Sequence, residues 1–186
     1  MSKEDPAPTE SLVNLHELID EFYQDPIGHA ELGGFIKQAS IPQPYSNLLD
    51  HRAHMTVTVE AHAGESVDVQ VHANHQRDKW YAREITLVTQ QTQRVVQYGI
   101  VRLDITKLAP IVWQQIESQD IPLGRVLIQH NVLREVELCG LWQVTAGPSL
   151  ALKMNQPEGT ILYGRTALIH CDRMPAIELL EIVNCC

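Results

Sequence analysis

Two neighbouring segments decide how this chain folds: WYAREITLV at residues 80–88 and RVVQYGIVRL at residues 94–103. Both segments are rich in β-branched and aromatic residues, which pack well in strands. The residues between them, 89–93, are polar, and a short polar connection between two such segments is typical of a hairpin. The sequence therefore predicts two antiparallel strands joined at residues 89–93.

The same pattern recurs on both sides of this hairpin. Upstream, MTVTVEAH (55–62) and SVDVQVHA (66–73) alternate polar and apolar residues around Ala63-Gly64-Glu65, which predicts another hairpin. Downstream strands are expected in LREVELCGLWQV (133–144), GTILYGRTALIH (159–170) and PAIELLEIV (175–183), with a third hairpin between the last two. Successive hairpins with helices between them predict an α+β protein with a largely antiparallel sheet. The second and third hairpins are weakly similar in sequence. In each, a strand that contains an arginine near its start is followed by a turn and an apolar return strand.

Helices are expected in three places. Apolar residues at helical spacing predict a helix from Ser11, capped by Ser11 or Thr9 and ended by Asp25-Pro26. Residues 104–119 are expected to form a second helix with Thr106 as its cap, and residues 125–131 a short third one. Residues 27–45 contain several glycines and prolines and are expected to be loop with at most one helical turn.

Length and composition exclude several classes of protein. With 186 residues the chain is expected to be one domain over residues 11–186, after a disordered segment at 1–10. Its net charge of −9 argues against non-specific binding of nucleic acid. No apolar stretch reaches the roughly 20 residues of a membrane span, and no signal peptide is visible, so a cytoplasmic protein without membrane contact is expected.

No sequence motif indicates a cofactor or a metal. Phosphate-binding, dinucleotide-binding, nucleophile-elbow and zinc-protease motifs are absent. His51 and His54 are three residues apart, as are His72 and His75, but no cysteine is spaced to complete a ligand set. These histidines are expected to be solvated or hydrogen-bonded, and no metal site is predicted.

A tight bend is expected at Pro122-Leu123-Gly124-Arg125. Proline and glycine at these positions favour a turn whose neighbouring backbone amides point the same way, and such amides can hold an anion. The alternative is an ordinary connector between two elements.

Arg83 is predicted to point into the core. On strict alternation it shares a strand face with Tyr81, Ile85 and Leu87, which is the mainly apolar face. A buried guanidinium needs a partner, because an unpaired buried charge is costly. Two interpretations follow: a structural ion pair with Glu178 or Glu181, or a two-bond clamp for the carboxylate of a ligand.

Glu178 and Glu181 are three residues apart in one expected strand, so they face opposite sides and only one can face the core. A core-facing carboxyl group suits a general acid or a hydrogen-bond partner for a ligand hydroxyl. Alternation alone does not choose between the two, since both faces of the strand are otherwise apolar.

Four groups of residues, in this order, resemble the chorismate pyruvate-lyases. They are Leu48-Leu49-Asp50 with Met55-Thr56, then Arg83-Glu84-Ile85, then Pro122-Leu123-Gly124-Arg125, then a proline-led strand with a late glutamate. The resemblance covers about residues 48–183 and is greatest to the divergent bacterial and plastid branch of that family.

The resemblance implies a compact antiparallel sheet covered by helices and a lyase that splits chorismate into 4-hydroxybenzoate and pyruvate without a cofactor. It implies that Arg83 grips the ring carboxylate, that Met55 and Leu123 contact it through their backbones, with Gly124 and Arg125 in the same bend, and that Glu181 is the acid near the hydroxyl. The proline-to-glutamate spacing is one residue short of the family pattern. Placing Glu181 in the pocket therefore needs a bulge after Pro175, and Glu178 remains a rival.

Other functions stay open. The fold of the lyases also serves as the ligand-sensing part of some transcription regulators, so a non-catalytic domain that binds a small carboxylic acid is an alternative. The acidic segment before Leu48 is too short for a winged-helix DNA reader. A lyase that makes 3-hydroxybenzoate and a structural protein with Arg83 paired to Glu181 are further alternatives, and the oligomeric state is not indicated.

Overall fold

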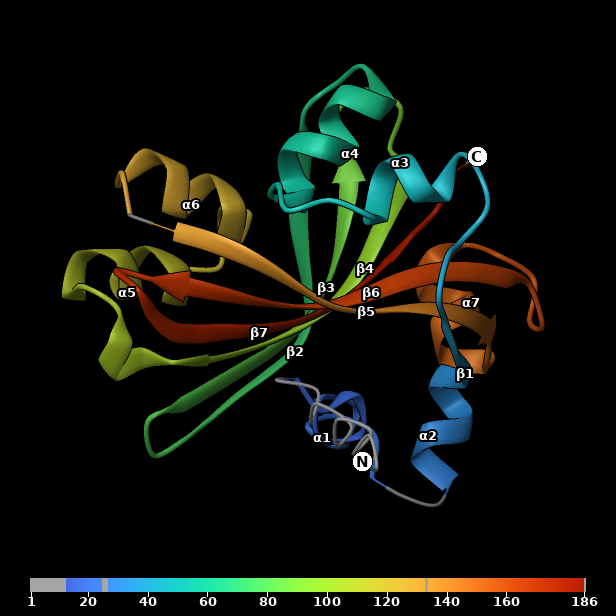
Figure 1. The fold of residues 1–186 in the computed structure, drawn as a ribbon, viewed down its shortest axis with the longest axis horizontal. Coiled ribbons are helices and arrows are strands. Elements are labelled where there is room, and N and C mark those ends of the chain that lie inside the picture. The colour runs from blue at the N-terminus through green and yellow to red at the C-terminus, as the bar shows by residue number, and fades with distance from the viewer. Residues whose placement is uncertain (1–12, 25–26, 133, 186) are drawn as a thin grey trace, which may run out of the picture.

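A seven-stranded antiparallel sheet forms the centre of the molecule (Figure 1). The structure is a computed structural model that describes residues 13–24, 27–132 and 134–185. The strand order is β1-β5-β6-β7-β4-β3-β2, and every neighbouring pair is antiparallel. The predicted α+β architecture is therefore confirmed. The strands are β1 (Gly33–Gln38), β2 (Val67–Arg77), β3 (Trp80–Thr89), β4 (Val95–Asp104), β5 (Arg134–Ala146), β6 (Ile161–Cys171) and β7 (Met174–Val183).

Two similar halves meet in the middle of this sheet, where β4 pairs with β7. On one side β3 and β2 follow outward, and on the other side β6 and β5 follow outward, with β1 added at the edge. The weak echo between two hairpins in the sequence corresponds to this arrangement. Arg83 on β3 and Arg165 on β6 occupy matching strands of the two halves.

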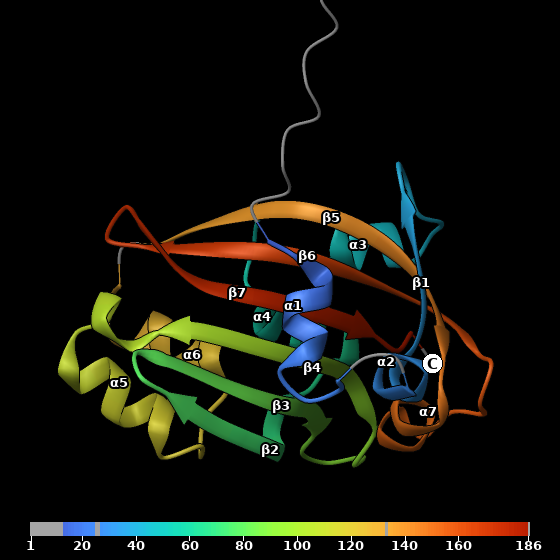
Figure 2. The same ribbon diagram turned by 90° about the horizontal axis from the view of Figure 1, so that it is seen from below.

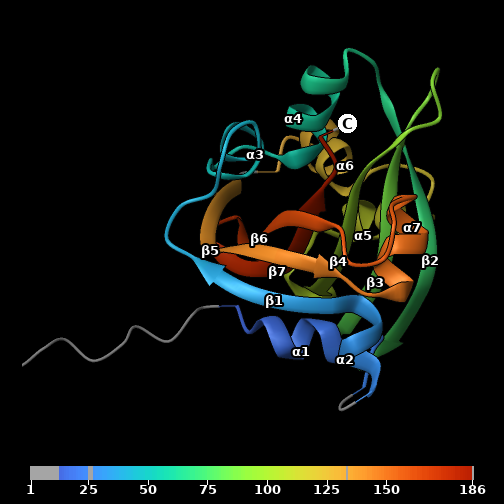
Figure 3. The same cartoon turned by 90° about the vertical axis from the view of Figure 1, so that its right-hand side faces the viewer.

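Helices cover both faces of the sheet (Figures 2 and 3). One face carries α1, α2 and α7, and the other carries α3, α4, α5 and α6. The helices are α1 (Leu15–Asp20), α2 (Ile27–Leu32), α3 (Tyr45–Leu49), α4 (Met55–Ala63), α5 (Pro110–Glu117), α6 (Leu123–Gln129) and α7 (Pro148–Met154), with a 3₁₀ turn η1 (Ile105–Lys107). Among the described helices, none is long and apolar enough to span a membrane.

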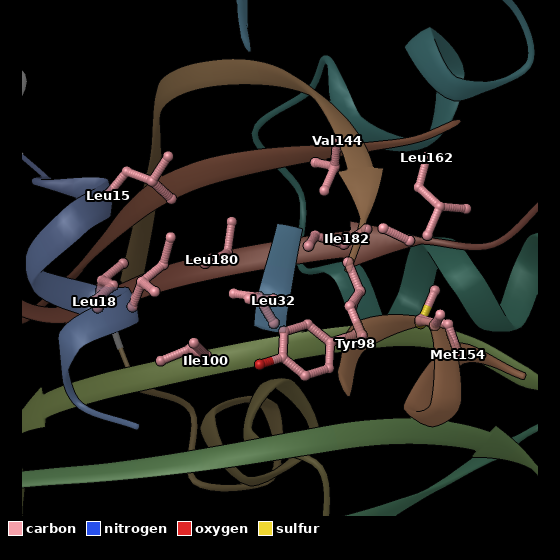
Figure 4. Close-up of a cluster of buried hydrophobic side chains, with 14 of the residues drawn as sticks. Leu15, Leu18, Leu32, Tyr98, Ile100, Val144, Met154, Leu162, Leu180 and Ile182 are labelled. Atoms are coloured by element: carbon pink, nitrogen blue, oxygen red, sulfur yellow. The ribbon is translucent and has the colours of Figure 1, made fainter. Parts of the chain in front are cut away.

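The core on the α1 side combines an apolar cluster with one buried polar network. Leu18, Tyr98 and Leu180 belong to the cluster, which Figure 4 shows between α1, the sheet and α7. The Tyr98 hydroxyl donates to Glu84 Oε1 at 2.7 Å, and Lys153 Nζ on α7 lies 3.4 Å from the same oxygen. Glu84 is 4% exposed, so these partners compensate a buried charge and attach α7 to β3.

Residues 55–62 form a helix, and the predicted strand there is wrong. Helix α4 ends at Gly64, whose left-handed φ of 74° suits a helix C-cap. Its buried residues Met55, Thr56 and Val59 have helical spacing, whereas Val57 is exposed. Packing against α6 and the sheet therefore overrides the strand preference of the alternating Val and Thr residues. Strand β2 pairs with β3 instead, so the expected upstream hairpin is replaced by a meander of β2, β3 and β4.

The expected loop at residues 27–45 is also wrong, because this stretch contains α2 and β1 and the start of α3. Strand β1 pairs with β5 and lies at the edge of the sheet. An edge strand is held mainly by backbone hydrogen bonds, so its sequence does not need a clear apolar pattern. Ser11, Thr9, Asp25, Pro26 and the segment 1–10 lie outside the described residues. Within the described part, the first helix is capped by Asn14, whose side chain accepts from the amides of His16 and Glu17.

Residues 104–119 form two elements instead of one helix. The Asp104 side chain accepts from the Thr106 amide at 3.0 Å and begins η1, so Thr106 is not the cap. Pro110 occupies the first turn of α5, where its missing N–H costs nothing. The predicted helix after Pro122 is confirmed as α6, but it begins at Leu123, so residues 123–125 form its first turn and not the expected separate bend.

Candidate functional site

A cavity lies between the N-terminal ends of α4 and α6 and the sheet face beneath them. Its empty volume, including the mouth, is about 480 Å³. It separates two apolar clusters, one under α5 and α6 and one under α3 and α4. The side chains that matter for its chemistry are His54, Arg83, Gln97, Arg165 and Glu181.

Arg83 is buried in the wall of this cavity without a counter-ion. Its side chain is 1% exposed, and neither Nε nor Nη1 has a hydrogen-bond partner in the part of the chain that the structure describes. Burial lowers the pKa of the Arg83 guanidinium, and the neighbouring Tyr81 hydroxyl partly offsets this effect. The predicted inward orientation of Arg83 is confirmed. The proposed ion pair with Glu178 or Glu181 is wrong, because both glutamates are bound by other arginines.

Arg165, which the sequence analysis did not propose as a site residue, binds Glu181. Arg165 Nε donates to Glu181 Oε2 at 2.7 Å, and the two residues face each other across β6 and β7. Its Nη1 donates to the His51 carbonyl at 2.8 Å, and its Nη2 to the Ala53 carbonyl at 3.1 Å. Arg165 thus holds the segment that leads into α4. The echo between the two arginine-led strands was the one sequence signal that pointed to it.

Glu181 lines the cavity, whereas Glu178 lies on the opposite sheet face. Glu178 accepts from Arg102 Nε at 2.6 Å, and burial raises the pKa of its carboxyl group. The register between β6 and β7 shifts where His170 pairs with Pro175 and Ile169 with Ile177, which leaves Ala176 as an extra residue. This irregularity lies directly after Pro175, where the resemblance requires a bulge.

Two helix N-termini meet at the mouth of the cavity. Helix α4 begins at Met55 and α6 at Leu123, and in the described residues no side chain caps either first turn. The first amides of a helix have no partner within it and carry partial positive charge, so they attract anions. A Cβ atom on Gly124 would lie 2.9 Å from Thr56 Oγ1, so glycine permits this close approach of the two helices.

Arg125 is not among the residues that line the cavity, so its part in binding stays a prediction. Its guanidinium binds the Glu60 carboxylate on α4, and both side chains are partly exposed. Arg125 is the third residue of α6, after Leu123 and Gly124, which line the cavity. It links α4 to α6 outside the site.

His54 is a second wall residue that the sequence analysis left among the solvated or hydrogen-bonded histidines. Its ring accepts a hydrogen bond from Arg134 Nε. Burial, with smaller contributions from the positive charges of Arg134 and Arg165, lowers the pKa of His54 to about 4. The ring is therefore neutral at physiological pH. The described residues contain no cluster of His, Cys, Asp or Glu that could hold a metal ion.

Acidification should destabilise the protein through His54. In the unfolded chain His54 binds a proton below its ordinary pKa of about 6.5, whereas in the folded protein its pKa is about 4. The free energy of unfolding therefore falls as the pH falls through this range. Urea unfolding at pH 7 and at pH 5 measures how much unfolding free energy is lost on acidification. This loss should be about 1 kcal/mol smaller in His54→Gln than in the wild type, after allowance for solvent screening. An unchanged pH dependence in the variant would show that His54 is not held neutral.

The fold and the cavity together define an α+β domain with a cavity on one face of its antiparallel sheet. No protein-family model matches the sequence, and no curated protein matches it either. Among solved structures, PhnF from Mycobacterium smegmatis has a TM-score of 0.51 at 10% identity, over 71% of this chain and 64% of PhnF. This likeness shows a shared fold.

Two further structures are similar. One is the ligand-binding domain of a protein described as a GntR-family transcriptional regulator from Bordetella bronchiseptica, with a TM-score of 0.47 and 11% identity over 63% of this chain and 85% of that domain. The other is a protein described as a transcriptional regulator, YydK from Bacillus subtilis, with a TM-score of 0.46 and 11% identity over 63% of this chain. The chain spans 57% of the length of YydK.

Proposed function

We propose that this protein binds a small carboxylic acid in the cavity and does so without transforming it. The observation that carries the proposal is the buried guanidinium of Arg83 in the cavity wall, whose Nε and Nη1 have no hydrogen-bond partner among the described residues. A buried charged donor without a partner is unfavourable in the free protein, and a ligand carboxylate would supply both the opposite charge and two acceptor oxygens.

The rest of the cavity supports an anionic ligand. Arg83 and Arg165 carry two positive charges and Glu181 one negative charge, so the wall has a surplus of one positive charge. The uncapped amides at Met55 and Leu123 add donors on the helix side of the same space. A singly charged acid therefore fits the charge of this site.

The position of Glu181 favours binding over acid catalysis. Glu181 Oε2 accepts a hydrogen bond from Arg165 Nε at 2.7 Å, so this oxygen already has a partner within the protein. A general acid must instead deliver a proton to the reacting group. Paired in this way, Glu181 is better suited to receive a hydrogen bond from a ligand.

Calorimetric titration with benzoate and benzamide tests the proposal. The two probes have nearly the same shape, but benzamide lacks the negative charge. We expect benzoate to bind at least about 10-fold more tightly, since a hydrogen bond to a charged group contributes roughly 1.5–3 kcal/mol. Equal affinity for the two probes, or no binding of benzoate, would contradict an acid site.

Chorismate pyruvate-lyase activity is a second proposal. What supports it is that Met55, Arg83, Leu123 and Glu181, the residues implied by the resemblance, all line one cavity. Incubation with chorismate should then yield 4-hydroxybenzoate and pyruvate in equal amounts without a metal or nucleotide. Glu181→Gln should reduce turnover roughly 100-fold, as loss of general acid catalysis does, with Glu178→Gln as the matched control. Pyruvate formation no faster than the uncatalysed rate would leave binding as the function.

A further inference from the structure

Gln97 on β4 is a buried polar side chain that the carboxylate site does not use. It is 3% exposed, it lines the cavity, and its Oε1 has no hydrogen-bond partner among the described residues. Buried side-chain acceptors are almost always paired in folded proteins, because leaving one unpaired is unfavourable. In the sequence, Gln97 is the one amide in the apolar run of residues 95–101.

The sheet register places Gln97 and Arg83 at opposite ends of the cavity floor. Along β4, Gln97 pairs with Leu87, Gly99 with Ile85, and Val101 with Arg83. Residues two apart in a strand share a face, and their Cα atoms lie roughly 7 Å apart. The Cα atom of Gln97 is therefore roughly 13 Å from that of Val101, the residue on β4 that pairs with Arg83. Each such pair of residues across β3 and β4 is called a row. Between the Gln97 row and the Arg83 row lie the apolar side chain of Ile85 on β3 and the carboxylate of Glu181 on β7.

Hydrogen-bond donors and acceptors are therefore segregated within the cavity. Arg83 offers unpaired donors at one end, and Gln97 offers an unpaired acceptor towards the other. Glu181 lies between them, opposite Gly99, and already accepts from Arg165. A ligand that satisfies both ends needs an acid group and, away from it, a group that donates a hydrogen bond.

We propose that Gln97 determines specificity by accepting a hydrogen bond from a hydroxyl or amino group on the ligand, at the end remote from its carboxylate. This inference rests on the proposed acid site and specifies the class of acid: one that carries a distal hydrogen-bond donor. An acid without that group leaves Gln97 Oε1 buried and unpaired, and binds less tightly for that reason.

The test uses two matched pairs of probes: benzoate with 4-hydroxybenzoate, and phenylacetate with 4-hydroxyphenylacetate. The second pair is longer by one methylene group, so a mismatch in length does not hide a preference for the hydroxyl. We expect the wild type to bind the hydroxylated member of at least one pair about 10-fold more tightly or better. Gln97→Leu should bring this preference for the hydroxylated acid below about 3-fold.

Thermal unfolding of the ligand-free variants separates recognition from a structural role. Gln97→Leu and Gln97→Met are close to isosteric and remove the unpaired acceptor, so their midpoints should equal or exceed that of the wild type. A lower midpoint in both variants, together with an unchanged hydroxyl preference, would assign Gln97 to packing and overturn the proposal.

The two proposals fail in different ways. If benzoate binds and benzamide does not, but neither pair shows a hydroxyl preference in the wild type, the acid site stands and the role of Gln97 is refuted. If none of the acids binds, the acid site is refuted and the inference about Gln97 falls with it.

Discussion

Replacing Arg83 by methionine is expected to abolish benzoate binding while leaving the folded protein at least as stable as the wild type. The guanidinium is buried, and two of its three nitrogen atoms have no partner within the described chain. Methionine fills a similar length of apolar space without a charge to desolvate. The expected loss of binding free energy is about 2–4 kcal/mol, the range for a charged hydrogen-bonding group in a buried site.

Arg83→Lys is the matched control for charge. Lysine keeps the positive charge but cannot offer a planar pair of donors, so it should recover only part of the benzoate affinity. Calorimetric titration gives the affinities, and urea unfolding without ligand gives the stability. We expect the ligand-free Arg83→Met protein to be unchanged or more stable by up to about 2 kcal/mol. A large loss of stability in Arg83→Met would show that Arg83 stabilises the folded protein and is not reserved for binding a ligand.

Replacing Arg165 by methionine is expected to have the opposite effect on stability. Arg165 is as deeply buried as Arg83, at 1% exposed, but it donates to Glu181 and to the carbonyls of His51 and Ala53. The substitution leaves Glu181 as a buried carboxylate without its partner and releases the segment before α4. Breaking a buried ion pair from one side costs about 3–5 kcal/mol.

The double variant Arg165→Met with Glu181→Gln tests this explanation. Because it removes both charges of the buried pair, it should recover part of the stability lost in the single variant. Urea unfolding of the two single variants and the double variant provides the measurement. If Arg165→Met unfolds at the same urea concentration as the wild type, the Arg165–Glu181 pair does not hold the site together.

The two arginines show why burial alone does not reveal a role. Both are polar residues in apolar strands, both are fully buried, and they occupy matching strands of the two halves of the sheet. The two arginines differ in their partners. Arg165 donates hydrogen bonds to Glu181 and to two backbone carbonyls, whereas Nε and Nη1 of Arg83 have no hydrogen-bond partner among the described residues. The two substitutions should therefore change the free energy of unfolding in opposite directions.

The sequence by itself determined the strands from residue 80 onward and the antiparallel α+β class, because β-branched and aromatic segments separated by short polar turns mark strands locally. It also determined that Arg83 shares a strand face with Tyr81, Ile85 and Leu87, since alternate side chains of a strand point to the same side. The helix after Pro122 also followed from local backbone preferences, although it begins at Leu123, where a bend was expected. Such features depend on residues close together in the chain.

Only the tertiary structure decided the features that depend on distant residues. It made residues 55–62 a helix against their local strand pattern, because the buried side of α4 packs on α6 and the sheet. In the folded protein Glu181 forms an ion pair with Arg165, and Glu178 forms one with Arg102. These pairs join different strands, so no spacing in the sequence could specify them. With both glutamates paired in this way, Arg83 Nε and Nη1 and Gln97 Oε1 have no hydrogen-bond partner in the part of the chain that the structure describes, and both residues line one cavity. The candidate site therefore arises from long-range pairing, which alternation along single strands does not encode.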